Sequence, residues 1–418
     1  MVTQYMKVLV PSQQSSEEPP AAQPEDNADD ITEASTASPS RSFSWSPVQS
    51  DTDEAELLNP ELVPSPTPGP DIEYCSLSPE ELPADIGTTF KDLLSACGQR
   101  SFTTFERLFK SISSEEGDEF EKIADGKNSE VFRVNTYTGD SVLKMVELDD
   151  TPELRDRLLS EIKIASRLTD LREGREYFTN GFVELKSVKC VFDSYPGELL
   201  RAREEAAGNL QKRRGGNESD RMPRAYLVWH MAYAGVPLDQ IELDNELQLW
   251  SVLHQMALSL AVAEEALEFE HRALWLRRVF VKRHVFAEQT SHYTIGGRSH
   301  DILTWGVETY IAGLTTIFSA IKNDPRDSIE PAVRSVNRDM EKIIRNDWSG
   351  FHPLTNLLWV LHVTKELRRR YKRKFSGSSR NDFEQMAWSE IGSWKQQLLE
   401  CPSLAEFIEK QCDNNPLS

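Results

Sequence analysis

The chain has 418 residues, enough for two or three domains, and its 68 acidic and 47 basic residues give a formal charge of −21. Residues 1–85 hold 17 of the acids and only two bases, so this fifth of the chain carries −15 and the remainder carries −6. We therefore expect no nucleic-acid binding through overall charge, because neutralising phosphates requires a basic surface.

Residues 1–85 also contain 13 of the 22 prolines and show neither helical nor alternating periodicity. Such a segment buries too little apolar area to offset the entropy of ordering it. We predict a disordered, acidic, Pro/Ser-rich tail. Its four Ser-Pro or Thr-Pro steps are either targets of proline-directed kinases or ordinary features of a solvated linker. They are Ser38-Pro39, Ser46-Pro47, Ser65-Pro66 and Thr67-Pro68.

The five cysteines are far apart and show no CxxC or zinc-ligand spacing, which favours free thiols in a reducing compartment. They are Cys75, Cys97, Cys190, Cys401 and Cys412. The first ten residues, with Gln4 and Lys7, do not resemble a signal peptide. The longest uncharged apolar run, residues 249–263, is too short and too polar to cross a bilayer. We expect neither secretion nor a membrane association.

A folded region is expected from about residue 86, where apolar residues begin to recur at helical spacing. The alternating stretches 119–136 and 141–147, separated by a turn at 137–140, predict a hairpin. Residues 152–171 predict an amphipathic helix, because Leu154, Leu158 and Ile162 fall on one face.

Strands are predicted over 182–192 and 226–229, and the charged stretch 201–220 is expected to be a surface loop. Residues 247–267 predict a long buried helix, and mostly helix is expected from there to the end. The sequence thus predicts an α+β fold with three parts: the tail 1–85, an N-terminal β-rich lobe 86–230 and a helical C-terminal lobe 231–418.

Three features of the N-terminal lobe occur in the order along the chain that nucleotide binding would require. They are the turn 124–129 with Gly126 and then Val131, the strand lysine Lys144, and the helix residue Glu161. A glycine turn can lay backbone N–H groups over phosphates, while a lysine held by a helical carboxylate contacts phosphate oxygens. Each is an ordinary surface feature by itself, but their order and spacing together predict a nucleotide site.

Three sequence motifs further along the chain resemble those of a known family. Cys190-Val-Phe-Asp-Ser-Tyr-Pro196, the run from Ser259 through Phe269-Glu-His-Arg272, and Phe351-His-Pro353 with Asn356-Leu-Leu-Trp359 are similar to signatures of the haspin family of atypical serine/threonine protein kinases. The resemblance covers about residues 120–412. It implies a two-lobed protein kinase fold, with ATP-dependent phosphorylation of histone H3 near its N-terminus, in the nucleus and during mitosis.

The sequence departs from this family where the chemistry occurs. In the family's catalytic loop an Asp accepts the substrate's proton and an Asn holds magnesium. Here the loop reads His271-Arg-Ala-Leu-Trp-Leu-Arg-Arg278, so His271 and Arg272 are retained, Ala273 replaces the Asp and Arg278 replaces the Asn. A methyl group accepts no proton, and a guanidinium repels a divalent metal. The structural interpretation is that His271 and Arg272 brace the loop.

Matching the sequence around Gly296-Gly297 and Gly306 to the family places Gly313 at its second metal ligand, and glycine offers no oxygen. Asp301 lies nearby in sequence, but nothing physical marks it as a substitute. Ala124 and Ser129 also replace the first and third glycines of the family's glycine-rich turn. The retained residues Gly126, Val131, Lys144 and Glu161, with Arg278 as a new cation, leave ATP binding open and disfavour Mg²⁺.

Three interpretations of function remain open. The first is a haspin-like pseudokinase that binds or scaffolds proteins, with histone H3 or chromatin proteins as partners. The second is an active kinase whose base and metal ligands come from unaligned positions. The third is a nucleotide sensor in which Arg278 replaces magnesium. The basic run 368–374 is either a nuclear-import signal, an acidic-partner patch or a solvated helix end. Nuclear localisation is the expectation.

Overall fold

A computed structural model describes most of the chain after residue 85, and these residues belong to one compact unit. The predicted tail with its Ser/Thr-Pro steps and the predicted metal position Gly313 lie outside the described residues. The described ranges are 86–112, 119–126, 129–137, 139–208, 222–286, 288–312, 331–345, 347–376 and 381–412.

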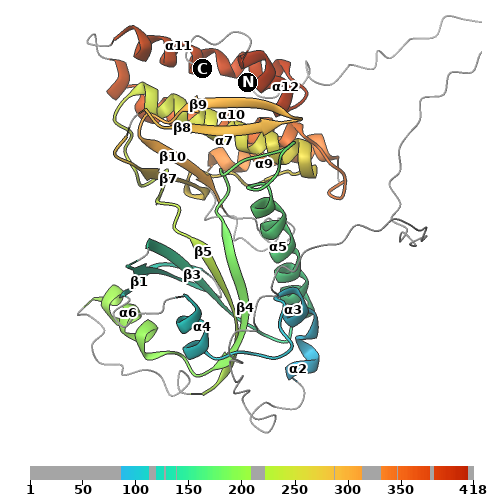
Figure 1. Cartoon of the computed structure of the whole chain (residues 1–418). Coiled ribbons are helices and arrows are strands. Elements are labelled where there is room, and N and C mark those ends of the chain that lie inside the picture. The colour runs from blue at the N-terminus through green and yellow to red at the C-terminus, as the bar shows by residue number, and fades with distance from the viewer. Residues whose placement is uncertain are drawn as a thin grey trace, which may run out of the picture. The chain divides into compact units, whose positions relative to one another are not determined.

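A five-stranded antiparallel sheet organises the first half, in the strand order β1-β2-β3-β5-β4 (Figure 1). Gly126 lies opposite Ser129, and Gly139 lies opposite Thr136, so the chain turns twice. The stretch 119–136, predicted as one arm of a hairpin, is therefore two strands of a meander, because the run Ala124-Asp125-Gly126 breaks its alternation. The strands are β1 Glu119–Gly126, β2 Ser129–Thr136, β3 Gly139–Glu147, β4 Leu185–Asp193 and β5 Arg224–Ala232.

Helices cover both faces of this sheet. On one face Leu143 packs in a cluster with Phe105 of α4 and Leu199 of α6, and on the other Val146 packs in a cluster with Leu158 of α5. Because successive side chains of a strand point to opposite faces, Lys144 shares the α5 face with Val146. The helices are α2 Ile86–Thr89, α3 Lys91–Ala96, α4 Phe105–Ile112, α5 Pro152–Asp170 and α6 Gly197–Ala207.

Helix α6 corrects the sequence prediction of a surface loop over 201–220. It begins after Pro196 and ends at Gly208, whose φ of +66° suits glycine. Its buried residues, Leu199 and Ala202, are only three positions apart among many charges, so the apolar pattern is too short to stand out. The rest of the predicted loop, 209–220, lies outside the described residues.

The second half is built around the long helix α7, Glu246–Leu267, as predicted. Every residue from Glu246 to Glu264 is buried, and the Asn245 side chain caps the helix by accepting the Gln248 N–H at 2.9 Å. Among the described helices, none has the length and apolar character that crossing a bilayer requires. Packed around α7 are α9 Pro331–Ile344, α10 Leu354–Tyr371, α11 Asp382–Glu400 and α12 Leu404–Cys412.

The short strands β7 to β10, between α7 and α9, correct the expectation of mostly helix to the end, and β6, which precedes α7, pairs with one of them. A three-stranded sheet has the order β10-β7-β6, and β8 pairs with β9 as a hairpin. The apolar alternation, as at Val279 and Val281, extends over only about five residues and is easily missed. The strands are β6 Val236–Pro237, β7 Val279–Arg283, β8 Thr290–Ile295, β9 Arg298–Leu303 and β10 Val307–Ile311.

The two halves are joined by main-chain hydrogen bonds as well as by the chain itself. The Val183 N–H donates to the Ile311 carbonyl at 3.1 Å, and the Ile311 N–H donates to the Gly181 carbonyl at 2.8 Å. Phe182 belongs to the helical core. The last strand of the large sheet, β5, ends at Ala232. The predicted two-lobed α+β fold, with a β-rich lobe and a larger helical lobe, is confirmed.

Candidate functional site

Lys144 lies in the middle of β3, opposite Val131 of β2 and Trp229 of β5. Directly opposite residues of antiparallel strands project from the same face, so these three side chains are neighbours. The Lys144 ammonium is 3.7 Å from the Glu161 carboxylate of α5 and 5.5 Å from the centre of the Trp229 ring. The structure therefore brings Val131, Lys144 and Glu161 together, while Gly126 lies at the turn end of β1.

Glu161 is a nearly buried carboxylate among several cations. Besides Lys144, the Arg157 guanidinium approaches it to 3.6 Å, and its side chain is only 7% exposed. Burial and the neighbouring Arg277 lower the pKa of Arg278 to about 10, and the negative charge of Glu161 opposes this shift. Lys144 and Arg157 thus pair with one carboxylate, and the charge of Arg278 also acts on it.

Gly126 has a local reason to be glycine. A Cβ at this position would collide with the Ser129 hydroxyl across the β1–β2 turn. The close approach accounts for the residue without a ligand, and the next two positions, 127 and 128, lie outside the described residues.

His271 is buried at the start of the loop that follows α7. Its backbone N–H donates to the Asn356 side chain at 3.0 Å, and its Nε2 lies 3.1 Å from the Ala312 carbonyl. Burial, together with the charge of Arg278, lowers the pKa of His271 to about 3, so the ring is neutral near pH 7. With a carbonyl as partner, Nε2 carries the hydrogen and donates it.

Arg272 and Glu270 form the centre of a bracing network. Arg272 has a φ of +54°, and its guanidinium pairs with Glu270 at 2.6 Å and donates to the carbonyls of Trp348 and Gly350. Glu270 also accepts the backbone N–H of His352 at 2.8 Å and the Thr355 hydroxyl. Both residues are fully used in holding the loop against the start of α10.

Glu264 fixes the loop from the other side. Its carboxylate accepts the Asn356 side-chain N–H at 2.9 Å and the Leu404 backbone N–H at 2.8 Å. Asn356 in turn bonds to the Phe269 carbonyl and to the His271 N–H. The family-like motifs 259–272 and 351–359 are therefore in direct contact, and these contacts hold the loop in place.

Ala273 occupies the predicted position of the proton acceptor, and it is 6% exposed. The adjoining Leu274 is fully buried in the helical core, and a 3-10 helix, Leu276–Arg278, follows. The Trp275 ring lies 4.2 Å from the Arg277 guanidinium and 5.0 Å from that of Arg278. The side chains of this stretch include a methyl group, an indole and two guanidinium groups, and none of these accepts a proton near pH 7.

Ala312 is a position that sequence reasoning missed. Val279 pairs with Ile311, and the Ala312 N–H donates to the Arg278 carbonyl at 2.8 Å, so Ala312 lies opposite Arg278. The alternation of buried and less buried residues over 307–311, which ends just before Ala312, was the signal that could have identified this position. Whichever of Ala312 and Gly313 corresponds to the second ligand, neither has a side-chain oxygen. Asp301 instead lies 2.7 Å from His292 on the β8–β9 hairpin.

The residues present do not fit a kinase magnesium site. Among the side chains that the structure describes, no group of three or more His, Cys, Asp or Glu residues could hold a metal ion. Magnesium requires oxygen ligands, and the positions expected to supply them carry a guanidinium, a methyl group or a hydrogen atom.

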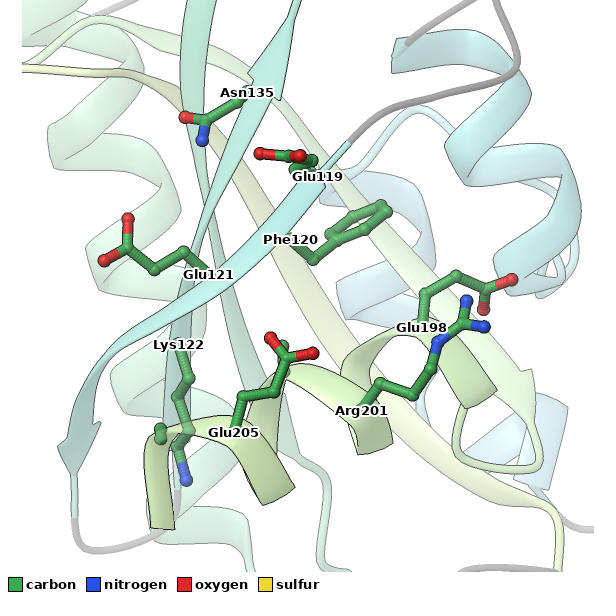
Figure 2. Close-up of a pocket in the computed structure, with 10 residues that line it drawn as sticks. Glu119, Phe120, Glu121, Lys122, Asn135, Glu198, Arg201 and Glu205 are labelled. Carbon is green, nitrogen blue, oxygen red and sulfur yellow. The ribbon is translucent and has the colours of Figure 1, made fainter. Parts of the chain in front are cut away.

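A different hollow, of about 620 Å³, lies between β1 and α6. Figure 2 shows the residues that line it, among them Phe120, the carboxylates Glu119 and Glu205, and the cations Lys122 and Arg201. Helix α6 covers the sheet face opposite Lys144, so this pocket is separate from the Lys144 and Glu161 pair.

The basic run 368–374 is partly occupied in structural bonds. Arg370 donates to the carbonyls of Leu238, Asp239 and Ile241, and Lys374 donates to that of Leu243. Arg369 pairs with Glu366. These contacts favour the structural interpretation of the run as the end of α10.

A β-rich lobe with a strand lysine paired to a helical glutamate, joined to a helical lobe with a buried His-Arg loop, defines a protein-kinase-like domain. The family described as Haspin like kinase domain matches residues 89–311, more than half of the chain. The chain belongs to this family, which confirms the resemblance seen in the sequence.

Individual relatives agree with the family match. The chain is 29% identical over 276 residues to the serine/threonine-protein kinase haspin of Bos taurus, covering 61% of this chain and 35% of the relative. It is 28% identical over 285 residues to that of Mus musculus, covering 63% and 37%. It is 27% identical over 342 residues to the haspin homolog of Arabidopsis thaliana, covering 75% and 55%. The chain thus spans about a third to a half of these relatives.

We expect Glu264→Gln to remove part of the pH dependence of stability. Burial raises the pKa of Glu264 from 4.5 to about 7. Between these values the folded protein keeps a proton that the unfolded chain releases, so this group's contribution to the free energy of unfolding falls as pH rises, by up to about 3 kcal/mol. In urea unfolding, the wild-type chain should lose stability relative to the variant between pH 5 and pH 8.

The adjacent exposed residue gives the matched control: the charge of Glu265 is a smaller cause of the raised pKa of Glu264 than burial, so Glu265→Gln should reduce this pH dependence only slightly. A stability difference between the wild-type chain and Glu264→Gln that is the same at pH 5 and pH 8 would contradict the buried, proton-retaining carboxyl.

Proposed function

We propose that this chain is a haspin-like pseudokinase, a kinase-fold domain that has lost phosphoryl transfer and acts by binding or scaffolding proteins. The observation that carries the proposal is the buried methyl group of Ala273 in a loop that is otherwise fully braced. The loop keeps its architecture while lacking the group that would take a proton from a substrate hydroxyl.

The loss of the base and the loss of the metal act together. A positioned general base contributes about 10²- to 10⁴-fold to rate. Metal ions neutralise the charge that develops on the transferred phosphoryl group, which is worth several kcal/mol more. With Arg278 opposite Ala312, the chain supplies a fixed cation at the end of β7 but no oxygen ligand from those two positions.

Glu264 at the end of α7 and Glu270 in the loop do not favour the alternative of an active kinase. Glu270 accepts hydrogen bonds from Arg272, His352 and Thr355, and Glu264 accepts them from Asn356 and Leu404. A carboxylate already engaged in this way cannot leave its partners without exposing buried donors. Neither Glu264 nor Glu270 can replace the missing base without breaking these hydrogen bonds.

The retained Lys144 and Glu161 need no catalytic role. An ion pair between β3 and α5 ties a strand to the helix that packs on it, and Glu161 is nearly buried. Removal of Lys144 would leave a buried carboxylate less well compensated, which is costly. Structural need alone is therefore a sufficient reason for both residues.

The partner and location are part of the proposal. The relatives are named serine/threonine-protein kinases, and kinases act on proteins. We propose protein partners, with histone H3 or chromatin proteins as the first to test, a nuclear location and a mitotic context. The haspin resemblance supports these choices.

The full chain should transfer no phosphate from ATP to a peptide of the histone H3 N-terminus, with either magnesium or manganese present. Ala273→Asp alone should not restore transfer, because the metal ligands would still be missing. Incorporation of radiolabelled phosphate measures this, with mouse haspin as the positive control. Incorporation by the wild-type chain that disappears in Lys144→Ala would overturn the proposal.

A second candidate function is the nucleotide sensor, and one observation favours it. Lys144 and Arg157 pair with the carboxylate of Glu161, and the charge of Arg278 also acts on it, so three cations gather where an anionic ligand would bind. Guanidinium groups bind phosphate well without a metal.

If ATP binds in this way, it should raise the melting temperature by several degrees at a concentration of about 100 times Kd. The rise should be the same with EDTA and with magnesium, since Arg278 would supply the counter-charge. Arg278→Ala should abolish it, and Arg277→Ala, at the exposed neighbouring position, is the control. A rise seen only with magnesium would exclude this sensor.

A further inference from the structure

Two cysteines far apart in sequence touch inside the N-terminal lobe. Cys97 follows the last residue of α3, and Cys190 lies in β4, 93 residues later. Their sulfur atoms are 3.8 Å apart, and both side chains are buried. Neither cysteine belongs to the Lys144 and Glu161 pair or to the loop that contains Ala273.

The backbone on both sides of the pair is held in place. Gln99 accepts the Cys190 N–H at 2.7 Å and donates to the Cys190 carbonyl at 3.1 Å. Thr103 adds a main-chain bond to the same carbonyl and accepts the N–H of Phe192. A disulfide requires sulfur atoms at about 2.05 Å, so the two sulfur atoms must approach each other from their present separation of 3.8 Å.

The two sulfur atoms differ in their chemistry. A hydrogen bond from the Cys190 thiol lowers the pKa of Cys97, and the positive charge of Lys189 acts in the same direction. The same contact, together with burial, raises the pKa of Cys190. Cys97 is also the more accessible of the two, 9% exposed against 0% for Cys190, so it is the sulfur that a small oxidant reaches first. A thiolate with a neighbouring thiol is the arrangement in which oxidation ends in a disulfide.

We propose that Cys97 and Cys190 form an oxidation site at which a peroxide converts the two thiols into a disulfide. The Cys97 thiolate attacks one oxygen of hydrogen peroxide, which breaks the O–O bond and gives a sulfenic acid and hydroxide. The Cys190 sulfur then attacks the Cys97 sulfur, the S–S bond forms, and the displaced hydroxyl leaves as water with the Cys190 proton. Both cysteines are oxidised and the peroxide is reduced.

The disulfide would fasten α3 to β4 on the face of the sheet that also holds α5. Leu93 and Leu94 of α3 pack in one cluster with Leu158 and Ile162 of α5, next to Glu161 in sequence. Oxidation would therefore restrict movement of the helix that carries Glu161. The site stands whether or not the domain transfers phosphate, so the pseudokinase proposal and this one fail separately.

The test uses the full chain in a Cys75→Ser, Cys412→Ser background, which removes the two cysteines whose side chains are not described. Reduced protein is treated with hydrogen peroxide, blocked with iodoacetamide and mapped by mass spectrometry without reduction. We expect a Cys97 to Cys190 linked peptide, lighter by two hydrogen atoms than its parts, and a melting temperature higher by about 5 °C or more. Dithiothreitol should reverse both changes.

Three variants distinguish this site from general oxidation. Cys97→Ser and Cys190→Ser should each abolish the linked peptide and the rise in melting temperature. Cys401→Ser, at a buried cysteine beside Lys410 in the other lobe, should preserve both. Peroxide treatment that leaves Cys97 and Cys190 unlinked in the folded wild-type background, or drives Cys97 to sulfinic acid without a link, would overturn the proposal.

Discussion

The carboxylate of Glu270 is the interaction on which the rest of the site depends. It holds the Arg272 guanidinium, a backbone N–H of His352 and the Thr355 hydroxyl, while its own side chain is only 4% exposed. Through Arg272 it also fixes the carbonyls of Trp348 and Gly350. A buried charge of this kind is costly to leave unpaired, so the loop keeps its form without any demand from catalysis.

The consequence is a kinase-like loop whose conformation is held by residues other than those at the catalytic positions. His271 is neutral and Arg272 is fully bonded, so both are preserved by packing and hydrogen bonds. Ala273 and Arg278 lie in the same loop yet belong to none of the bonds made by Glu264 and Glu270. A proton acceptor and a metal ligand can therefore be lost there while the fold survives.

Residues whose role is periodic or local could be predicted from sequence, and residues whose role depends on long-range pairing could not. The amphipathic face of α5 and the largely buried α7 were predicted, because each extends over several turns. Helix α6 and the strands β7 to β10 were missed, since their apolar patterns are too short. The position of Ala312 opposite Arg278 follows from the pairing of β7 with β10, and the contact of Cys97 with Cys190 depends on the docking of α3 against β4.

The most direct test of the central claim is a crystal structure of the full chain grown with a non-hydrolysable ATP analogue and excess manganese, analysed by anomalous scattering. We expect no manganese ion to be coordinated by a protein side-chain oxygen near Arg278, Ala312 or Gly313. A manganese peak there, bound by a carboxylate of this chain and beside a second carboxylate within hydrogen-bond reach of Ala273, would contradict it.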